Sequence, residues 1–531
     1  MKKRTTVWGG IGRGDCGRSI IATLMMVCVV CALLSPPLAE AKELRVGLQS
    51  IEGASAGMDS HHTTNAHAQV TYSIHETLIE RDPYARPLKF KPALATSWKM
   101  IQPTVMEMKL RKGAKFHDGS TINADDVAFS LNRIWQRTRP EYEMVQGQFF
   151  YNFDRVEVVD SLTVRIHTKR PEPLMEVLLS DRCASIISKG YYEKVGFEKA
   201  DLAPVGAGPY RVISYKSGQQ LVVERFKDYW GEKAPLDRIT FTCIPEISSR
   251  ITALVNREVD FIVSIPPDQE GPLRNRNDLK LLGVVWPMFH VFAINMTHPV
   301  TKNKKLRQAM NLSVNRELLV KGLWHEKGLV PRAHQFKEYG EPLYMPELVT
   351  VKYDPERARQ LVKESGYDGT PILLTFLPHY YTYGNLAAQA IAEMWQNVGI
   401  QVKLQSIDSF PSNLKDIMIR PWSNPMYYPD PMGAYDTHWS NSAWPYRRNF
   451  FKPENPKWNE LYQKARFSTD VRERREAYTE LLRIAEDEAG YILLYQPYEA
   501  FAMRSDIEWE TPTTLRPYTL TFRAGQIKIG R

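Results

Sequence analysis

The feature of the sequence that most restricts the fold is a change in hydrophobic periodicity along the chain. Short runs in the first half alternate apolar and polar residues, which is the period of a half-buried strand, and turn residues separate them. The second half interleaves such runs with segments of helical spacing. Strands are expected at 44–48, 105–110, 156–159, 162–166, 210–215, 221–226, 372–376 and 400–404. This pattern predicts an α/β protein, and the chain contains no internal repeat.

Capping residues mark several helix ends. Asn123, with Asp126 three residues later, has the spacing of a capping box at a helix start. Asp354 followed by Pro355 predicts a second helix start, and Gly366 predicts the end of that helix. Further helices are expected around 306–314, at about 386–398 before Gly399, and at 478–489.

An apolar segment at 20–34 follows a basic stretch and precedes the helix-breaking sequence 35–37. The small residues at 39–41 complete the pattern of a secretory signal peptide cut after Ala41. An uncleaved anchor is the alternative, but about fifteen apolar residues fall short of the roughly twenty that span a membrane. Cys28 and Cys31 each follow a valine, so a lipoprotein signal is excluded. We therefore expect export to the periplasm.

The remaining composition is that of a globular protein of about three folding units. The 531 residues are 43% hydrophobic and carry a formal net charge of +9, without a basic tract or a nucleic-acid motif. Binding of DNA or RNA is therefore not expected. After removal of the leader, only Cys183 and Cys243 remain. An oxidising compartment would permit a disulfide between them, and two buried thiols are the alternative.

Catalytic motifs are present only as incomplete patterns. The segment 75–79 begins as a zinc-protease helix does, but Ile79 occupies the position of the second histidine ligand. The glycines at 206 and 208 are followed by Pro209 and lack the rest of a dinucleotide loop. No phosphate-binding loop or nucleophile elbow is present. We therefore expect neither an enzyme nor a bound cofactor.

Histidines at 61, 62 and 67 raise the question of a metal site. Neutral imidazoles suit nickel, copper or zinc, so His61, His62 and His67 would be the candidate ligands. No carboxylate or thiol at a useful spacing completes the set. A solvated loop with incidental histidines is therefore the preferred interpretation, and no metal site is predicted.

Aromatic residues are concentrated in a few polar loops. They are Tyr380, Tyr381, Tyr383, Trp422, Tyr427, Tyr428, Tyr435, Trp439, Trp444 and Tyr446. Loops normally avoid large apolar surface, so this concentration indicates a recognition site where rings cover a ligand and polar tips donate hydrogen bonds. About half of these rings are expected to belong to the core instead.

Long motifs in the mature chain resemble a known family. They include LKFKPALATSW at 88–98, MKLRKGAKFHDGSTINADDVAFSLNRI at 108–134 and PVGAGPYRVISYKSGQQLVVERFKDYWG at 204–231. RITALVNREVDFI at 250–262, FAINMTHPVTKNKKLRQAMNLSVNRELLV at 292–320 and YDPERARQLVKESGYDG at 353–369 follow in order. The chain thereby resembles the family 5 solute-binding proteins of bacterial ABC importers, which bind oligopeptides, dipeptides, nickel or some oligosaccharides.

The resemblance implies a two-lobed periplasmic binding protein of type II with an extra subdomain inserted in lobe I. Lobe I would take 42–290, with the inserted subdomain at about 86–202, and lobe II would take 291–489. The segment 490–531 would return to lobe I, so the hinge crossings would lie near Phe292 and Tyr491. A ligand would bind between the lobes and stabilise their closed state. The implied partners are an ABC permease and its ATP-binding subunits, and the protein is expected to be a monomer.

Candidate ligand residues follow from the same resemblance. Peptide-binding relatives anchor the peptide ammonium with an Asp three residues after a Trp, but here Pro425 occupies that position after Trp422. Asp430 is the only nearby acid and is expected to meet an amine, while Arg420 is expected to meet a carboxylate. The remaining ligand-binding candidates are Glu52 of the segment 49–52 in lobe I, and Tyr380, Tyr381, Tyr383, Trp422, Tyr427, Tyr428 and Trp439 in lobe II.

The solute itself stays open at this point. A peptide or peptide-like solute is the leading hypothesis. The displaced acid and the many tyrosines leave an oligosaccharide or another uncharged solute as the alternative, because a buried ammonium without a carboxylate is costly. A metal chelate held by the three histidines and a non-transport enzyme or chaperone are lesser alternatives.

Overall fold

The structure of the chain is a computed structural model. It describes residues 1, 3–10, 42–51, 58–61, 65–135, 149–349, 351–378, 380–411, 414–515 and 517–530, and for 65–68 the backbone only. The chain divides into two compact units, Met1–Lys42 and Glu43–Arg531. The apolar segment 20–34 and the expected cleavage site at Ala41 lie outside the described residues. Within the described part of the chain, no helix has the length and hydrophobicity needed to cross a membrane.

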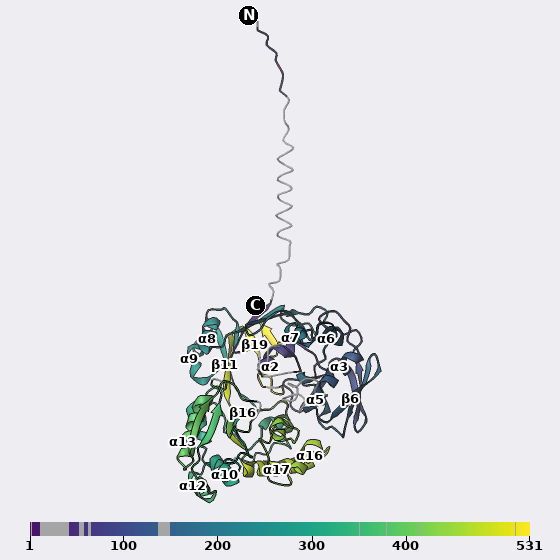
Figure 1. Cartoon of the computed structure of the whole chain (residues 1–531). Helices are drawn as coiled ribbons and strands as arrows, with labels where there is room; N and C mark the ends of the chain where they lie inside the picture. The colour runs from purple at the N-terminus through teal and green to yellow at the C-terminus, as the bar shows by residue number, and fades with distance from the viewer. Residues whose placement is uncertain are drawn as a thin grey trace. The chain divides into compact units, whose positions relative to one another are not determined.

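A seven-stranded sheet forms the centre of lobe I (Figure 1). Its strand order is β12 (Leu279–Val285), β18 (Tyr498–Arg504), β11 (Phe261–Ile265), β1 (Glu43–Leu48), β10 (Arg238–Cys243), β9 (Gln220–Arg225) and β8 (Tyr210–Lys216). β1 runs parallel to both of its neighbours, whereas β18 is antiparallel to β11 and β12. One core cluster packs β1 and β10 against α2 (Asn65–Ile74), and another packs β11 against α8 (Ile247–Val255). Sequence segments more than 400 residues apart therefore share one sheet.

A five-stranded sheet forms lobe II. Its order is β15 (Val402–Ser406), β14 (Ile372–Phe376), β16 (Ile419–Pro425), β13 (Met288–Ile294) and β17 (Tyr491–Tyr495). One core cluster joins this sheet to α10 (Lys304–Leu312), α11 (Arg316–Trp324), α12 (Pro355–Glu364) and α13 (Gly384–Gln396). Residues on the other side of the strands pack toward α16 (Trp458–Phe467) and α17 (Val471–Glu488). Helices on both faces explain why β13 and β17 are buried along their whole length.

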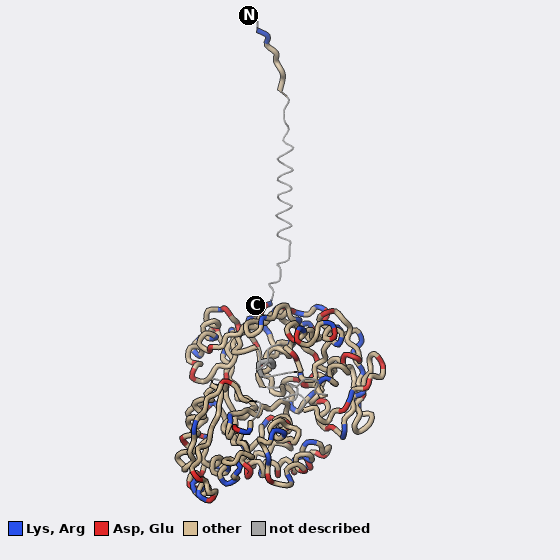
Figure 2. The backbone as a smooth tube through the Cα atoms, in the orientation of Figure 1, with Lys and Arg blue, Asp and Glu red and all other residues tan. Residues whose placement is uncertain are grey.

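A four-stranded antiparallel sheet lies within the inserted segment. Its order is β4 (Ala95–Gln102), β5 (Val105–Leu110), β7 (Thr163–Thr168) and β6 (Phe153–Asp160), and α3 (Ala124–Trp135) packs on it. Two small sheets pair β2 (Ile79–Arg81) with β3 (Phe90–Pro92) and β19 (Ile507–Trp509) with β20 (Ile527–Ile529). The shorter helices are α5 (Met175–Leu179), α6 (Lys189–Val195), α7 (Phe197–Leu202), α9 (Gly271–Arg274), α14 (Met432–Tyr435), α15 (Trp444–Arg447), η2 (Arg182–Ala184), η3 (Pro267–Gln269) and η4 (Lys337–Tyr339). In the unit from Glu43 onward, acidic and basic residues are interspersed along the described backbone, as the absence of a charge tract predicts (Figure 2).

Local sequence signals correctly predicted the main elements. The capping box of α3 is formed, because Asn123 Oδ1 accepts from the Asp126 amide at 3.3 Å and Asp126 Oδ2 accepts from the Asn123 amide at 3.0 Å. Asp354 caps α12 through the Arg357 amide at 2.8 Å, and Gly366 ends it at a φ of 68°. The expected strands 105–110 and 372–376 coincide with β5 and β14. One helix expected around 306–314 ends earlier, since α10 stops at Leu312 and α11 begins at Arg316.

Two strand connections join the two large sheets. β12 of the first sheet leads to β13 of the second through Trp286 and Pro287, and β17 returns to β18 through Gln496 and Pro497. The Trp286 amide donates to the Pro497 carbonyl at 3.0 Å, so the two connections are bonded to each other. Strand membership therefore places the crossings a few residues away from the expected positions near Phe292 and Tyr491, which lie inside β13 and β17.

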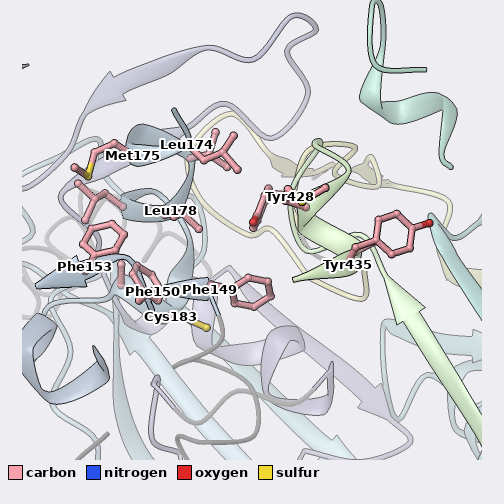
Figure 3. Close-up of a cluster of buried hydrophobic side chains, with 14 of the residues drawn as sticks. Phe149, Phe150, Phe153, Leu174, Met175, Leu178, Cys183, Tyr428 and Tyr435 are labelled. Atoms are coloured by element: carbon pink, nitrogen blue, oxygen red, sulfur yellow. The ribbon is translucent and has the colours of Figure 1, made fainter. Parts of the chain in front are cut away.

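The largest core cluster combines residues of the inserted subdomain and lobe II. Phe149, Phe150 and Phe153 lie beside Leu174, Met175 and Leu178, and Phe149 faces Tyr428 with ring centroids 5.7 Å apart (Figure 3). Cys183 is buried in this cluster, whereas Cys243 ends β10 and its Sγ donates to the Gln49 carbonyl at 3.4 Å. The two cysteines are not joined by a disulfide. The possible bridge is therefore not formed in the structure, because its two ends belong to different cores.

Candidate functional site

The aromatic loops of lobe II emerge from one edge of its sheet. β14 and β16 are parallel neighbours, so their last residues, Phe376 and Pro425, lie at the same edge. The segment after β14 carries Tyr380, Tyr381 and Tyr383, and the segment after β16 carries Tyr427, Tyr428 and Asp430. The edge of an α/β sheet beyond the carboxyl ends of its strands is a common position for ligand sites. The expected lobe II candidates are thus brought together in the fold, although their side chains differ in what they contact.

Arg420 on β16 is a partly buried cation held between two rings. Its guanidinium carbon lies 3.5 Å from the Phe410 ring centroid and 4.4 Å from the Trp422 ring centroid. Its Nε donates to the Pro421 carbonyl at 3.4 Å, and none of the described acidic residues forms a salt bridge with it. Burial lowers the pKa of Arg420 to about 10. A buried guanidinium with aromatic neighbours and no carboxylate has free donor capacity for an anionic group.

Of the tyrosines after β14, Tyr380 and Tyr381 lie near Arg420, and Tyr383 reaches lobe I. Tyr381 lies next to Ser423 of β16, with 3.2 Å between the two hydroxyl oxygens. The Tyr383 hydroxyl donates to Asp268 of η3 in lobe I. Tyr380 is exposed. Burial raises the pKa of Tyr381, whereas Arg420 lowers it, so the phenol and the guanidinium are close enough to interact. Two of the three expected tyrosines thus lie where the lobes meet.

The structure corrects the role expected for Asp430. Arg474 Nη2 donates to both of its carboxylate oxygens, at 2.7 and 2.8 Å, and the Met432 amide donates to Oδ1 at 3.0 Å. Asp430 and Arg474 are both buried. A carboxylate with these partners already has its charge compensated, so Asp430 holds the chain in place and is not available to a ligand amine.

Two of the expected ligand aromatics are core residues. Trp439 has no exposed surface and stacks on Tyr435 with ring centroids 3.9 Å apart, and Tyr428 is 1% exposed. Their contact with ligand is contradicted by this burial. Trp422 and Tyr427 are partly buried at the surface of the same cluster, and Trp422 also contacts His438 and Trp444. Of the ten aromatic residues, Tyr428, Tyr435 and Trp439 are buried, which is fewer than the expected half.

The histidine-rich segment is not a solvated loop at His61. His61 Nε2 lies 2.8 Å from the Ser185 carbonyl oxygen, and its Nδ1 lies 3.0 Å from Arg133 Nη1. Burial lowers the pKa of His61 to about 4. Glu52, His62 and the His67 side chain lie outside the described residues. Among the residues that are described, no group of three or more His, Cys, Asp or Glu side chains has the arrangement of a metal site.

Sequence reasoning missed two residues at the junction of the lobes, Glu499 and Tyr518. Glu499 is the second residue of β18, next to the return crossing, and Trp286 Nε1 donates to its Oε2 at 3.3 Å. Tyr518 lies on Trp286 with ring centroids 4.6 Å apart. The available signal was an acidic residue inside the strongly apolar segment 491–503. A charge in such a run has either a structural partner or a functional role.

Comparisons with known proteins agree with this architecture. The family model for bacterial extracellular solute-binding proteins, family 5, matches residues 89–446. A dipeptide-binding protein of Escherichia coli is 28% identical over 77% of this chain and 83% of its own length. A glutathione-binding protein of Pectobacterium atrosepticum is 27% identical over 73% of each chain. A periplasmic binding protein from Helicobacter pylori, solved in complex with the peptide STSA, has a TM-score of 0.81 at 22% identity, covering 92% of this chain and 99% of its own.

The solved structure supports the fold, and the match of the family model to more than half of the chain establishes membership. The fold is the α/β, two-lobed architecture of the type II periplasmic binding proteins, with a subdomain inserted in lobe I. The chain belongs to family 5 of the bacterial extracellular solute-binding proteins.

Proposed function

We propose that this protein is the periplasmic solute-binding subunit of an ABC import system and that its solute is a peptide or peptide-like molecule with a free carboxylate. The observation that carries the proposal is Arg420, a partly buried guanidinium between Phe410 and Trp422. It has no carboxylate partner among the described residues. Keeping a buried charge without a counter-charge is unfavourable unless a ligand supplies one.

The relatives support the choice of a peptide. Two relatives that match most of this chain are named as binders of dipeptides and of glutathione, and both of these ligands carry carboxylates. The solute would lie between the lobes, with Trp422 and Tyr427 covering it and Tyr381 beside its carboxylate. Contacts to both lobes at once would favour the closed state, which the permease and its ATP-binding subunits would then recognise.

Delivery to the periplasm would depend on the N-terminal segment. The basic start, the apolar stretch at 20–34 and the small residues before position 42 have the pattern of a cleavable signal peptide. N-terminal sequencing of the exported protein should begin at Lys42. A start at Met1 in the membrane fraction would instead support an anchor.

The test compares ligands with and without a free carboxylate. A pool of di- to tetrapeptides should raise the melting temperature of the wild-type protein, and the same pool with amidated C-termini should not. Arg420→Met should remove the response to the free pool, whereas Arg472→Met, at an exposed arginine of α17, should keep it. If neutral oligosaccharides raise the melting temperature and peptides do not, the peptide proposal is wrong.

A further inference from the structure

Glu499 is a buried acid beside the connection between the lobes. It is 7% exposed, and it pairs with Val284 in the sheet, two residues after Pro497 of the return crossing. The elements around it supply the Trp286 indole, the Ser264 side chain, the Arg250 guanidinium of α8 and the Tyr518 phenol. Two of these groups, Trp286 and Ser264, are hydrogen-bond partners, and both are neutral.

Arg250 does not neutralise this acid directly. It donates to the carbonyl oxygens of Ile244, Pro245 and Ser264, and it forms no salt bridge with Glu499. Burial raises the pKa of the Glu499 carboxyl to about 7, although the indole, the Ser264 side chain and Arg250 all lower it. Lobe I therefore contains a buried carboxyl that lacks a close cation, and lobe II contains a partly buried guanidinium that lacks a carboxylate.

Two phenols connect these groups across the junction. Tyr518 lies on Trp286 and Tyr381 lies on His290, four residues further along the chain, each with ring centroids 4.6 Å apart. The charges agree with this placement, because Arg420 lowers the pKa of Tyr381, and Tyr381 and Glu499 both raise the pKa of Tyr518. Tyr381 and Tyr518 keep some solvent exposure, yet burial is the largest cause of the raised pKa of both phenols. That combination is expected for side chains deep in the protein that a solute can still reach. Arg420, Tyr381, Tyr518 and Glu499 thus form a series from lobe II to lobe I, with opposite charges at its ends.

We infer that Glu499 binds the ammonium group of a zwitterionic ligand whose carboxylate is held by Arg420. This inference rests on the proposed function and assigns to lobe I the role that Asp430 was expected to have in lobe II. The ligand class is a short peptide or peptide-like molecule with both ends free. Lobe II would hold the carboxylate end of the ligand and lobe I the ammonium end. A ligand with only one of these groups would contact only one lobe, whereas a ligand with both would hold the two lobes together.

Proton release follows from this arrangement. An ammonium group favours the ionised carboxylate, so binding would lower the pKa of Glu499 from its value of about 7 in the unliganded protein. Below about neutral pH, binding would therefore release protons, and affinity would decrease as the pH falls. Calorimetry of the wild-type protein in two buffers of different ionisation enthalpy measures this release without any substitution.

The decisive experiment uses three forms of one pool of di- to tetrapeptides: free, N-acetylated and C-amidated. The free form should bind at least about tenfold more tightly than either blocked form. Glu499→Gln should remove the preference for free over acetylated peptides and the proton release, while it keeps the preference for free over amidated peptides. Glu508→Gln, at an exposed acid of β19, is the matched control and should change neither preference.

The outcomes separate the two proposals. If none of the three pools binds, the proposed function fails, and the role of Glu499 fails with it. If free and acetylated pools bind the wild-type protein equally, or if Glu499→Gln keeps the preference for a free amine, only the role of Glu499 is overturned. Should the Gln variant not fold, the absence of proton release from the wild-type protein at about pH 6 would overturn it as well.

Discussion

The inserted subdomain and lobe I each face lobe II through charged side chains, but the two regions differ in how completely those charges are paired within the protein. In the first region, Arg466 of α16 bonds Glu172 of the inserted subdomain at 2.6 and 2.9 Å and Asp436 at 3.0 Å. All three side chains are fully buried. In the second region, the buried Glu270 pairs with Lys327 of lobe II, but the partly buried Arg420 and the buried Glu499 have no oppositely charged partner in the described chain.

This difference in pairing distinguishes charges that stabilise the fold from charges that a ligand could contact. Burial alone would lower the pKa of Arg466, but Glu172 and Asp436 raise it well above its ordinary value. Burial lowers the pKa of Arg420 to about 10, because no carboxylate offsets it. A pair complete within the protein stabilises one arrangement of the lobes. An incomplete pair makes that arrangement depend on a solute that supplies the missing charges.

The largest effect on stability is expected at the boundary with the inserted subdomain, where the buried charges are fully paired. Arg466→Met should leave Glu172 and Asp436 as buried carboxylates without a cation and lower the free energy of unfolding by about 3–5 kcal/mol. Urea denaturation of the unliganded protein measures this change. Arg472→Met should stay close to wild type, and equal stability of both variants would show that the Arg466 network is not structural.

Asp430→Asn should also lower the free energy of unfolding, and it should change peptide affinity only slightly. Arg474 would keep only a neutral partner, and a loss of about 2–4 kcal/mol in the free energy of unfolding is expected. Peptide affinity should change less than about threefold, since the side chain has no free acceptor for a ligand. A large loss of affinity with unchanged stability would restore the role first expected for Asp430.

Arg420→Met should have the reverse profile. Removing an uncompensated buried charge should leave the unliganded protein as stable as wild type or more stable, whereas affinity for carboxylate ligands should decrease about 100-fold. Thermal melts without ligand and calorimetry with ligand measure the two quantities. A variant that loses stability and keeps affinity would place Arg420 with Arg466 as a structural residue.

A smaller, pH-dependent effect is expected at Glu499. Burial raises its pKa from 4.5 to about 7, so between these values the folded protein binds a proton that the unfolded chain does not. Its contribution to stability is therefore present below about pH 4.5 and is lost as the pH rises to 7, by at most about 1.4 kcal/mol per pH unit. The difference between wild type and Glu499→Gln in denaturation across this range isolates the contribution, and a pH-independent difference would contradict it.

The smallest effect is expected from reducing agents. Cys183 and Cys243 belong to separate cores and are not bonded to each other, so dithiothreitol should leave the melting temperature unchanged. A native disulfide would instead contribute about 2–5 kcal/mol and shift it by several degrees. Such a shift would require the two cysteines to meet in solution.

How much of the structure can be predicted from the sequence depends on how far apart along the chain the interacting residues lie. The boundaries of β5 and β14 and the caps of α3 and α12 were predictable, because their signals lie within a few residues. The site was only partly predictable. Tyr381 was identified from the concentration of aromatic residues and Arg420 from the family resemblance, whereas the role of Asp430 was misjudged because its partner Arg474 lies 44 positions away on α17.

The sequence by itself determined the α/β class, the family and the local elements, since periodicity, capping residues and long motifs act over short distances or are recognisable in order. Only the tertiary structure decided which charges are compensated. A carboxylate or a guanidinium has the same chemistry wherever it occurs, and its burial and partners depend on segments that approach one another only when the sheets assemble. Asp430 is therefore paired with Arg474, while Arg420 and Glu499 have no oppositely charged partner in the described chain.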